Sequence, residues 1–191
     1  MQLANLQKQK ADRVLGIDAS TASVAFCLFE NGIPSKMGKL PIVGATIYDK
    51  IKDANGKAKI IAQLCDPEYV AVESAIMVKS ADAGIKIAMI VGAILSVILK
   101  PETKVVTVAP ISWQSYIGNK NFTKIQKLDV EKEFPGKSAA WYKNKIREKR
   151  KQFTMDFFND KFKISISDND VGDATGIAYY AYKTLTERTD G

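Results

Sequence analysis

The order of the apolar runs in this chain constrains its fold more than any other feature. Two runs of strand length, 13–18 and 22–30, precede the turn signal Asn31-Gly32, and this order is typical of a β-hairpin. Three further runs have the length and composition of strands: 36–43, 69–73 and 104–108. The first of these can add a third antiparallel strand, whereas helical segments precede the other two. We therefore expect an α/β fold in which parallel strands are added beside the first strand of a mixed sheet.

The spacing of apolar residues predicts helices between and after these strands. Residues 46–65 are compatible with one or two helical stretches around Asn55-Gly56. Residues 80–99 form a nearly continuous apolar helix, but its uncharged core of about 13 residues is shorter than the roughly 20 that a bilayer needs. This helix is apolar on more than one face, which leaves two alternatives: a homodimer contact or complete burial within one subunit. Shorter or more polar helical segments are predicted at 110–116, 124–133 and 138–158.

Composition narrows the class of protein. At 191 residues and 46% apolar content, we expect one globular domain over 1–191, with flexible tails at 1–12 and 187–191. The polar start contains no secretory signal, so we expect an intracellular, cytoplasmic protein of a bacterium or an infected host cell. Cys27 and Cys65 have no CxxC spacing, which favours reduced core thiols. The chain has no histidine, which excludes mechanisms that require an imidazole.

The positive charge of the chain is confined to one stretch. Residues 119–163 contain 13 Lys and Arg against 6 Asp and Glu, while the rest of the chain has 15 of each. Such a local surplus favours an anionic polymer as partner, and nucleic acid is the usual one. The alternative is a solvated charged helix.

Four acids lie in or beside segments that are otherwise apolar. Asp18 ends the first strand-like run, Glu73 ends the run 69–73, and Asp170 and Asp173 open a final helical stretch. Side chains at neighbouring strand ends can meet at one sheet edge, and acids at i and i+3 share a helix face. A carboxylate cluster repels itself unless divalent cations enter, so we expect two Mg²⁺ ions, with Mn²⁺ as a substitute, that activate water for phosphodiester hydrolysis.

Structural roles are the alternatives for these acids. Asp18 precedes Ala19-Ser20-Thr21 and can be a turn residue, and Asp170 can cap the last helix. Asp168 is a further carboxylate that could replace Asp170 as the ligand.

Three segments carry a resemblance to a known family. GIDASTASVAFCLFENG resembles the first hairpin of the RNase H-like superfamily, and VAVESAIMVKSADAGIKIAMIVGAI resembles the second catalytic segment of the RuvC family of Holliday junction resolvases. DVGDATGIAYYAY is similar to the terminal acidic helix of that family. The resemblance implies an RNase H-like fold with a mixed five-stranded sheet, three strands antiparallel and then two parallel, flanked by helices. It also implies a homodimer and Mg²⁺-dependent incision of branched DNA.

Position by position, the resemblance assigns metal binding and catalysis to Asp18, Glu73, Asp170 and Asp173. The chain departs from the family at two places. Ile76 stands where the family often has an aromatic residue that contacts an unpaired base, and Trp113-Gln114 stands where it commonly has a lysine, a charge that Lys120 or Lys124 can supply instead. The long basic stretch before the final acids is similar to bacteriophage or poxvirus-type members.

The sequence therefore predicts a Holliday junction resolvase, a structure-selective endodeoxyribonuclease in which two sites of a homodimer cut opposed strands of a four-way junction. No membrane and no small-molecule cofactor is expected. The alternatives are a broader nuclease for flaps and Y-forks, and a non-catalytic RNase H-like binding module; a sugar-kinase-like ATPase lacks support because no Gly-rich phosphate segment is found. Basic residues expected to hold DNA are Lys79, Lys86, Lys120, Lys124, Lys143, Lys145, Arg147, Lys149, Arg150 and Lys151.

Overall fold

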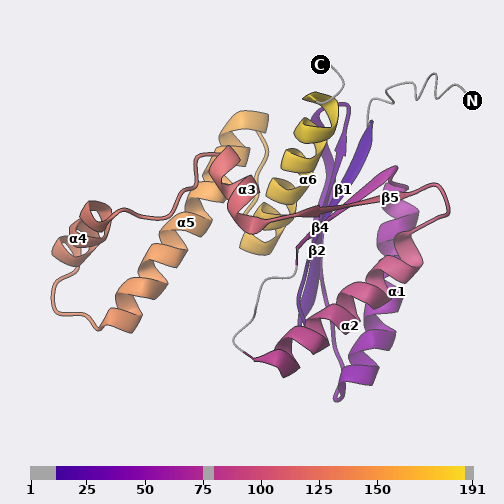
Figure 1. Cartoon of the computed structure of the whole chain (residues 1–191), viewed down its shortest axis with the longest axis horizontal. Coiled ribbons are helices and arrows are strands. Elements are labelled where there is room, and N and C mark those ends of the chain that lie inside the picture. The colour runs from indigo at the N-terminus through magenta and orange to yellow at the C-terminus, as the bar shows by residue number, and fades with distance from the viewer. Residues whose placement is uncertain (1–11, 75–79, 188–191) are drawn as a thin grey trace, which may run out of the picture.

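The structure is a computed structural model that describes residues 12–74 and 80–187. Its strands form one mixed sheet in the order β3-β2-β1-β4-β5 (Figure 1). β1 pairs antiparallel with β2 and parallel with β4, so the three-antiparallel, two-parallel arrangement is confirmed. The strands are β1 Arg13–Ala19, β2 Ser23–Glu30, β3 Ile33–Pro41, β4 Tyr69–Glu73 and β5 Lys104–Val108.

Helices cover both faces of the sheet. On one face, α6 packs against the central strands with α3 and the end of α5 beside it, and on the other face lie α1 and α2 (Figure 1). Alternation along the strands divides the two cores, because successive side chains point to opposite faces: Val14 packs with the α6 side and Leu15 with the α1 side. The helices are α1 Ile47–Cys65, α2 Ala81–Ile98, α3 Pro110–Tyr116, α4 Lys124–Glu133, α5 Ala139–Phe162 and α6 Asn169–Glu187.

The first helix is continuous across the point where the sequence left two alternatives. α1 passes through Asn55-Gly56 without a break, and a capping box between Thr46 and Asp49 fixes its start. A left-handed Asp66 ends it. The tails expected at 1–12 and 187–191 lie almost wholly outside the described residues.

The basic stretch forms an arm rather than a layer on the core. α4 and the first half of α5 extend away from the sheet (Figure 1), and Phe134 packs on Trp141 at the arm's far end. The apolar side chains of α5 do not share one environment: Trp141 packs in the arm, Phe153 is 44% exposed, and Phe158 is buried. Only the second half of α5 reaches the aromatic core below α6.

α2 is the most apolar helix and remains largely uncovered. Ile90, Ile94 and Ile98 are buried against α1 and the sheet, but Ile85 is 61% exposed. By length and composition alone, α2 is apolar enough to cross a membrane, and 17% of it is buried. Its buried isoleucine row packs like a helix of a globular core. The other side of α2 is exposed, so the alternative of complete burial within one subunit is wrong.

One glycine controls how closely α6 approaches the sheet. A Cβ added to Gly16 on β1 would lie 2.3 Å from the carbonyl oxygen of Ala174 and 2.6 Å from the amide nitrogen of Ala178. The backbone of α6 therefore rests directly on the centre of β1. Ala174 and Ala178 are themselves fully buried, so small residues on both sides make the contact possible.

Substitution of this glycine should destabilise the fold. Gly16→Ala forces α6 away from β1, and we expect a loss of about 3 kcal/mol in the free energy of unfolding. Gly56→Ala is the matched control, because a Cβ there meets nothing within 4 Å and should add roughly 0.5–1 kcal/mol within a helix. Urea denaturation measures both. Equal effects of the two substitutions would contradict the close approach.

Candidate active site

The first two acids lie side by side at the ends of parallel strands. β1 and β4 run in register, with Ile17 opposite Val72, so Asp18 and Glu73 follow directly at the same edge. Both side chains belong to the alternating set that faces α6, as Val14 and Ala71 do. Strand pairing and alternation therefore place two carboxylates beneath the start of α6.

The other two acids come from the first turns of α6. Asp170 and Asp173 share one side of the helix and line a cavity of about 270 Å³ together with Asp18 and Glu73. The remaining lining residues are Ser20, Ser23, Arg147 and Lys151. The close approach of α6 at Gly16 sets this position, because Asp173 immediately precedes Ala174 at the contact.

Burial and repulsion between carboxylates disfavour the ionised forms of Asp18, Asp173 and Glu73. Burial, followed by the charges of Asp173, Glu73 and Asp170, raises the pKa of Asp18 to about 7. The pKa of Asp173 rises to about 6, again chiefly because of burial. Burial also raises the pKa of Glu73, against the hydrogen bond from Trp113. The charges of Lys151 at Asp18, and of Lys151 and Arg147 at Asp173, oppose this rise but do not offset the effect of burial.

Among the described residues, Asp170 is the one acid of the cavity that forms ion pairs with lysines. The Nζ atom of Lys39 lies 2.6 Å from its Oδ2, and the Nζ atom of Lys151 lies 3.8 Å from its Oδ1. Burial alone would raise the pKa of Asp170, but the hydrogen bonds from Lys39 and Asn169 and the nearby lysine charges bring it below its ordinary value.

Asp168 differs from the four cavity acids in position and in role. Its Oδ1 accepts hydrogen bonds from the backbone N–H groups of Asp170 and Val171, which is how a cap satisfies a helix start. Its Oδ2 binds Lys39 at 3.0 Å. The carboxylate of Asp168 thus caps α6 outside the cavity, while Asp170 lines the cavity.

The donor set fits a divalent cation in kind. Four carboxylates give the oxygen ligands that Mg²⁺ and Mn²⁺ take, and burial together with the neighbouring carboxylates raises the pKa values of Asp18 and Asp173. Within the described residues, however, no three acidic side chains lie close enough to share an ion as they stand. Binding of one ion by three of these acids would therefore require side-chain rotation toward the centre of the cavity, including release of Asp170 from Lys39.

Trp113 is a residue of the site that sequence reasoning did not assign. It is 1% exposed, and its indole Nε1 donates a hydrogen bond of 3.2 Å to Oε1 of Glu73. Its ring lies against Gly176 of α6, where an added Cβ would meet ring atoms at 2.5 Å. Trp113 therefore orients Glu73 and ties α3 to α6. The only sequence signal was its place where the family commonly has a lysine.

Lys39 was also missed, because no single segment reveals a cross-strand register. Lys39 pairs with Ala25, and Ala25 pairs with Asp18. Lys39 therefore stands two strands from Asp18 on the same face, where it can reach Asp168 and Asp170.

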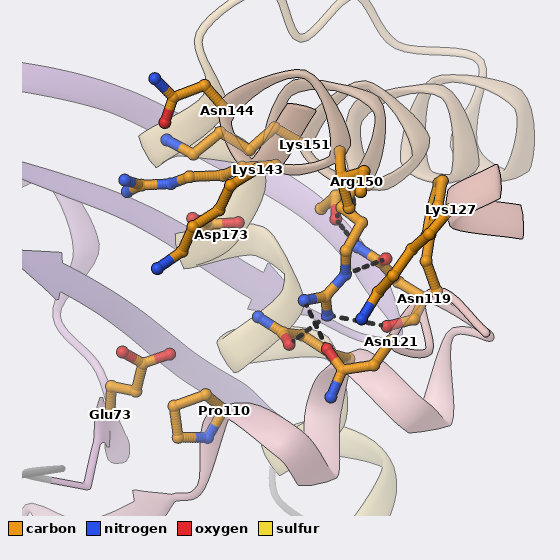
Figure 2. Close-up of a pocket in the computed structure, with 15 residues that line it drawn as sticks. Glu73, Pro110, Asn119, Asn121, Lys127, Lys143, Asn144, Arg150, Lys151 and Asp173 are labelled. Atoms are coloured by element: carbon orange, nitrogen blue, oxygen red, sulfur yellow. Dashed lines mark hydrogen bonds between the residues drawn. The ribbon is translucent and has the colours of Figure 1, made fainter. Parts of the chain in front are cut away.

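A second, larger cavity of about 710 Å³ adjoins the acids. Glu73, Asp173, Arg147 and Lys151 line both cavities. In Figure 2, Glu73 and Pro110 lie on one side of the larger cavity and Asn119, Asn121 and Arg150 on the other. Of the basic residues predicted to hold DNA, it brings together Lys143, Arg147, Arg150 and Lys151, and it adds Lys127.

The remaining predicted DNA contacts are placed apart from this cavity. Lys120 and Lys124 are exposed and do not line it. Lys86 pairs with Asp82 on α2 at 2.6 Å, and Lys145 pairs with Glu148. Lys149 binds Glu133 across the arm at 2.5 Å. Lys79 and Ile76 lie outside the described residues.

The sheet order and the helices on its two faces define an RNase H-like fold. Among solved structures, the chain is similar to RuvC of Thermus thermophilus in complex with a Holliday junction substrate, with a TM-score of 0.63 and 12% identity over 90% of this chain and 94% of that chain. A second T. thermophilus RuvC structure gives a TM-score of 0.62 and 13% identity over 92% and 96%.

The yeast mitochondrial Holliday junction resolvase Ydc2 is also similar, with a TM-score of 0.53 and 11% identity over 93% of this chain and 81% of that chain. No protein-family model matches the sequence, and neither does any curated protein sequence. The chain therefore has the RuvC-like fold that the resemblance implied. The bacteriophage or poxvirus type stays a prediction.

The raised pKa values predict an unusual pH dependence of stability in the absence of metal. The pKa of Asp18 is about 7 in the folded protein against an ordinary 3.8, so folding favours its protonated form. The free energy of unfolding should therefore fall as the pH rises from about 4 to 7, by at most roughly 4 kcal/mol for this group. Urea denaturation with a chelator present measures the slope.

Asp18→Asn should reduce this slope without removing it, because the raised pKa values of Asp173 and Glu73 act in the same direction. Asp49, Asp66 and Asp170 have lowered pKa values, so their contributions to stability are lost only below about pH 4, outside the window. If the free energy of unfolding of the wild type rose between pH 4 and 7, or fell equally in the variant, the raised pKa of Asp18 would be contradicted.

Proposed function

We propose that this protein is a metal-dependent endonuclease that cleaves branched DNA, with four-way junctions as its preferred substrate. The observation that carries the proposal is the meeting of Asp18, Glu73, Asp170 and Asp173 in one cavity of a RuvC-like fold. The likeness to structures of Holliday junction resolvases supports the substrate class.

The four carboxylates would hold the divalent cation, which supplies an activated water and stabilises the charge that develops on the cleaved phosphodiester. Trp113 keeps one oxygen of Glu73 oriented by its hydrogen bond. Lys39 and Lys151 neutralise Asp170, which would have to leave these partners to hold the cation. Arg147 and Lys151 line the acid cavity and can bind the phosphates of the strand that enters it.

The arm gives this strand a path. Lys127, Lys143 and Arg147 line the cavity between the arm and the sheet, and their charges attract the phosphate backbone without reading its sequence. Lys145 and Lys149 instead place their Nζ atoms 5.6 and 5.8 Å from the ring centre of Phe134. Their pairs with Glu148 and Glu133 stiffen the arm, so their phosphate contacts would require exchange of these partners.

We propose that α2 forms the homodimer contact. Ile85, Ala88, Gly92 and Ser96 are exposed along one side of the helix, opposite the buried row Ile90, Ile94 and Ile98. Small residues at this spacing let a second helix approach closely, and burial of the apolar face would offset the cost of association. A two-fold axis at α2 would relate two acid cavities, as cutting of opposed strands requires.

Loss of either strand-end acid should abolish cleavage. Asp18→Asn and Glu73→Gln remove a ligand charge from the cavity, and we expect the rate on a synthetic four-way junction with Mg²⁺ to fall about 10³-fold or more, with junction binding retained. Single-turnover gel assays on a junction, a flap, a Y-fork and linear duplex measure both activity and selectivity. Equal cutting of flaps and forks would favour the broader nuclease.

Two substitutions serve as controls. Asp160→Asn makes the same change at an exposed position of α5 and should leave the rate unchanged. Asp168→Ala removes the cap of α6, so it should lower stability by about 1 kcal/mol and retain cleavage within about tenfold. If Asp18→Asn cut junctions as fast as Asp160→Asn, the nuclease proposal would fail, and binding without any cutting by the wild type would favour the binding module.

A charge on the exposed face of α2 should separate the subunits. Ile85→Asp places a carboxylate in the proposed contact, whereas Ile33→Asp adds one at another exposed isoleucine, 59% exposed at the start of β3. We expect sedimentation velocity to give a dimer for the wild type and Ile33→Asp, and a monomer for Ile85→Asp. A monomeric wild type would refute the contact.

A further inference from the structure

The larger cavity is built around one arginine that does not point into solvent. The guanidinium of Arg150 donates to Oδ1 and the backbone oxygen of Asn119, to Oδ1 of Asn121 and to Oε1 of Gln114, at 2.7–3.1 Å. Figure 2 shows these bonds converging on Arg150. Four donors are thus used within the protein, so Arg150 organises the cavity, and a phosphate contact would have to displace these bonds.

Arg150 also fixes the orientation of the side-chain amides. Asn119 is buried and donates its amide N–H groups to the oxygens of Arg150 and Thr154, so it locks the linker after α3 onto α5. Asn121 and Gln114 line the cavity and bind the same guanidinium through their oxygens, so their N–H₂ groups are available to a ligand. Within residues 12–74 and 80–187, neither amide nitrogen donates to another protein group.

Two amide donors held by one guanidinium can select a particular kind of ligand. An edge that binds both must present two adjacent acceptors, and guanine does so with O6 and N7. Adenine presents N7 beside the N6–H₂ donor, which would face an amide donor and leave both unpaired.

The rest of the cavity suits one nucleotide. Phe122 is half-buried in its wall with Pro110 and Ile146, and an aromatic ring is a stacking surface for a base. The volume of about 710 Å³ falls within the range of about 300–1,000 Å³ for ligand sites. Lys127 and Lys143 supply charge for the phosphate.

We propose that this cavity holds one unpaired nucleotide of the cleaved strand and favours guanine over adenine through Gln114 and Asn121. Its position follows from Glu73 and Asp173, which line both cavities, so the nucleotide flanks the cleaved bond. Unpairing a base costs least at a branch point, where stacking is already interrupted. The inference rests on the proposed function and adds a preference that phosphate contacts cannot give.

The test uses four-way junctions that differ in one nucleotide near the branch. Guanine, adenine and 7-deazaguanine, which lacks the N7 acceptor, are placed in turn at each of the positions flanking the cut. We expect single-turnover cleavage to be about five- to tenfold faster with guanine than with adenine at one position, with 7-deazaguanine in between. Junction affinities measured with Asp18→Asn should follow the same order.

Substitution of the amides gives the sharper result. In Asn121→Asp or Gln114→Glu, one oxygen still accepts from Arg150 while the other replaces the amide donor. An acceptor beside the remaining donor matches adenine, so one of these variants should reverse the preference. Asn144→Asp is the matched control, because it adds the same charge to the same cavity outside the Arg150 network, and it should slow all junctions equally.

Phe122→Leu tests stacking separately. It should weaken binding of every junction about fivefold or more, without changing the order of the bases, and thermal melting verifies that the variant is folded. Equal cleavage of all base variants by the wild type, or an unchanged preference in both amide variants, would overturn the subsite while leaving the nuclease intact. If no junction is cut, the proposed function fails, and the affinities still decide the base preference.

Discussion

The contact between α6 and β1 is the constraint on which the rest of the structure depends. Gly16 and the alanines opposite it bring a helix backbone onto the middle of a strand. This distance sets the height of Asp173 over Asp18, and the ring of Trp113 against Gly176 sets the tilt of the same helix beside Glu73. Packing at small residues thereby fixes the spacing of charged groups that would otherwise repel one another.

The protein does not fully neutralise the carboxylates of the acid cavity. Asp170 has lysine partners, whereas Asp18 and Asp173 are half-buried and have raised pKa values. A fold that keeps such carboxylates sacrifices stability at neutral pH, which is typical of sites that bind a cation or a substrate rather than of structural ion pairs. In the neighbouring cavity, by contrast, the charged group has partners: the guanidinium of Arg150 donates four hydrogen bonds and holds its surroundings in place.

The sequence was sufficient for the sheet and for the meeting of the acids, because both follow from local patterns. Strand ends and the period of two place Asp18 and Glu73 at one edge, and the i,i+3 spacing places Asp170 and Asp173 together. The partners of long polar side chains could not be predicted, since these depend on register and tertiary packing. Lys39 reaches the acids across two strands, and the side chain of Arg150 points into the protein. The apolar side chains of α5 are divided between the arm and the core.

The acid cavity takes its members from β1 and β4 and from the far end of the described chain, α6. During synthesis, a chain that has grown only to Ile166 carries Asp18 and Glu73 but neither helix acid, and the face of β1 around Gly16 is uncovered. The cavity is therefore complete only after the sheet and the arm have been made. An interrupted translation product would carry the basic arm without the two helix acids of the cavity.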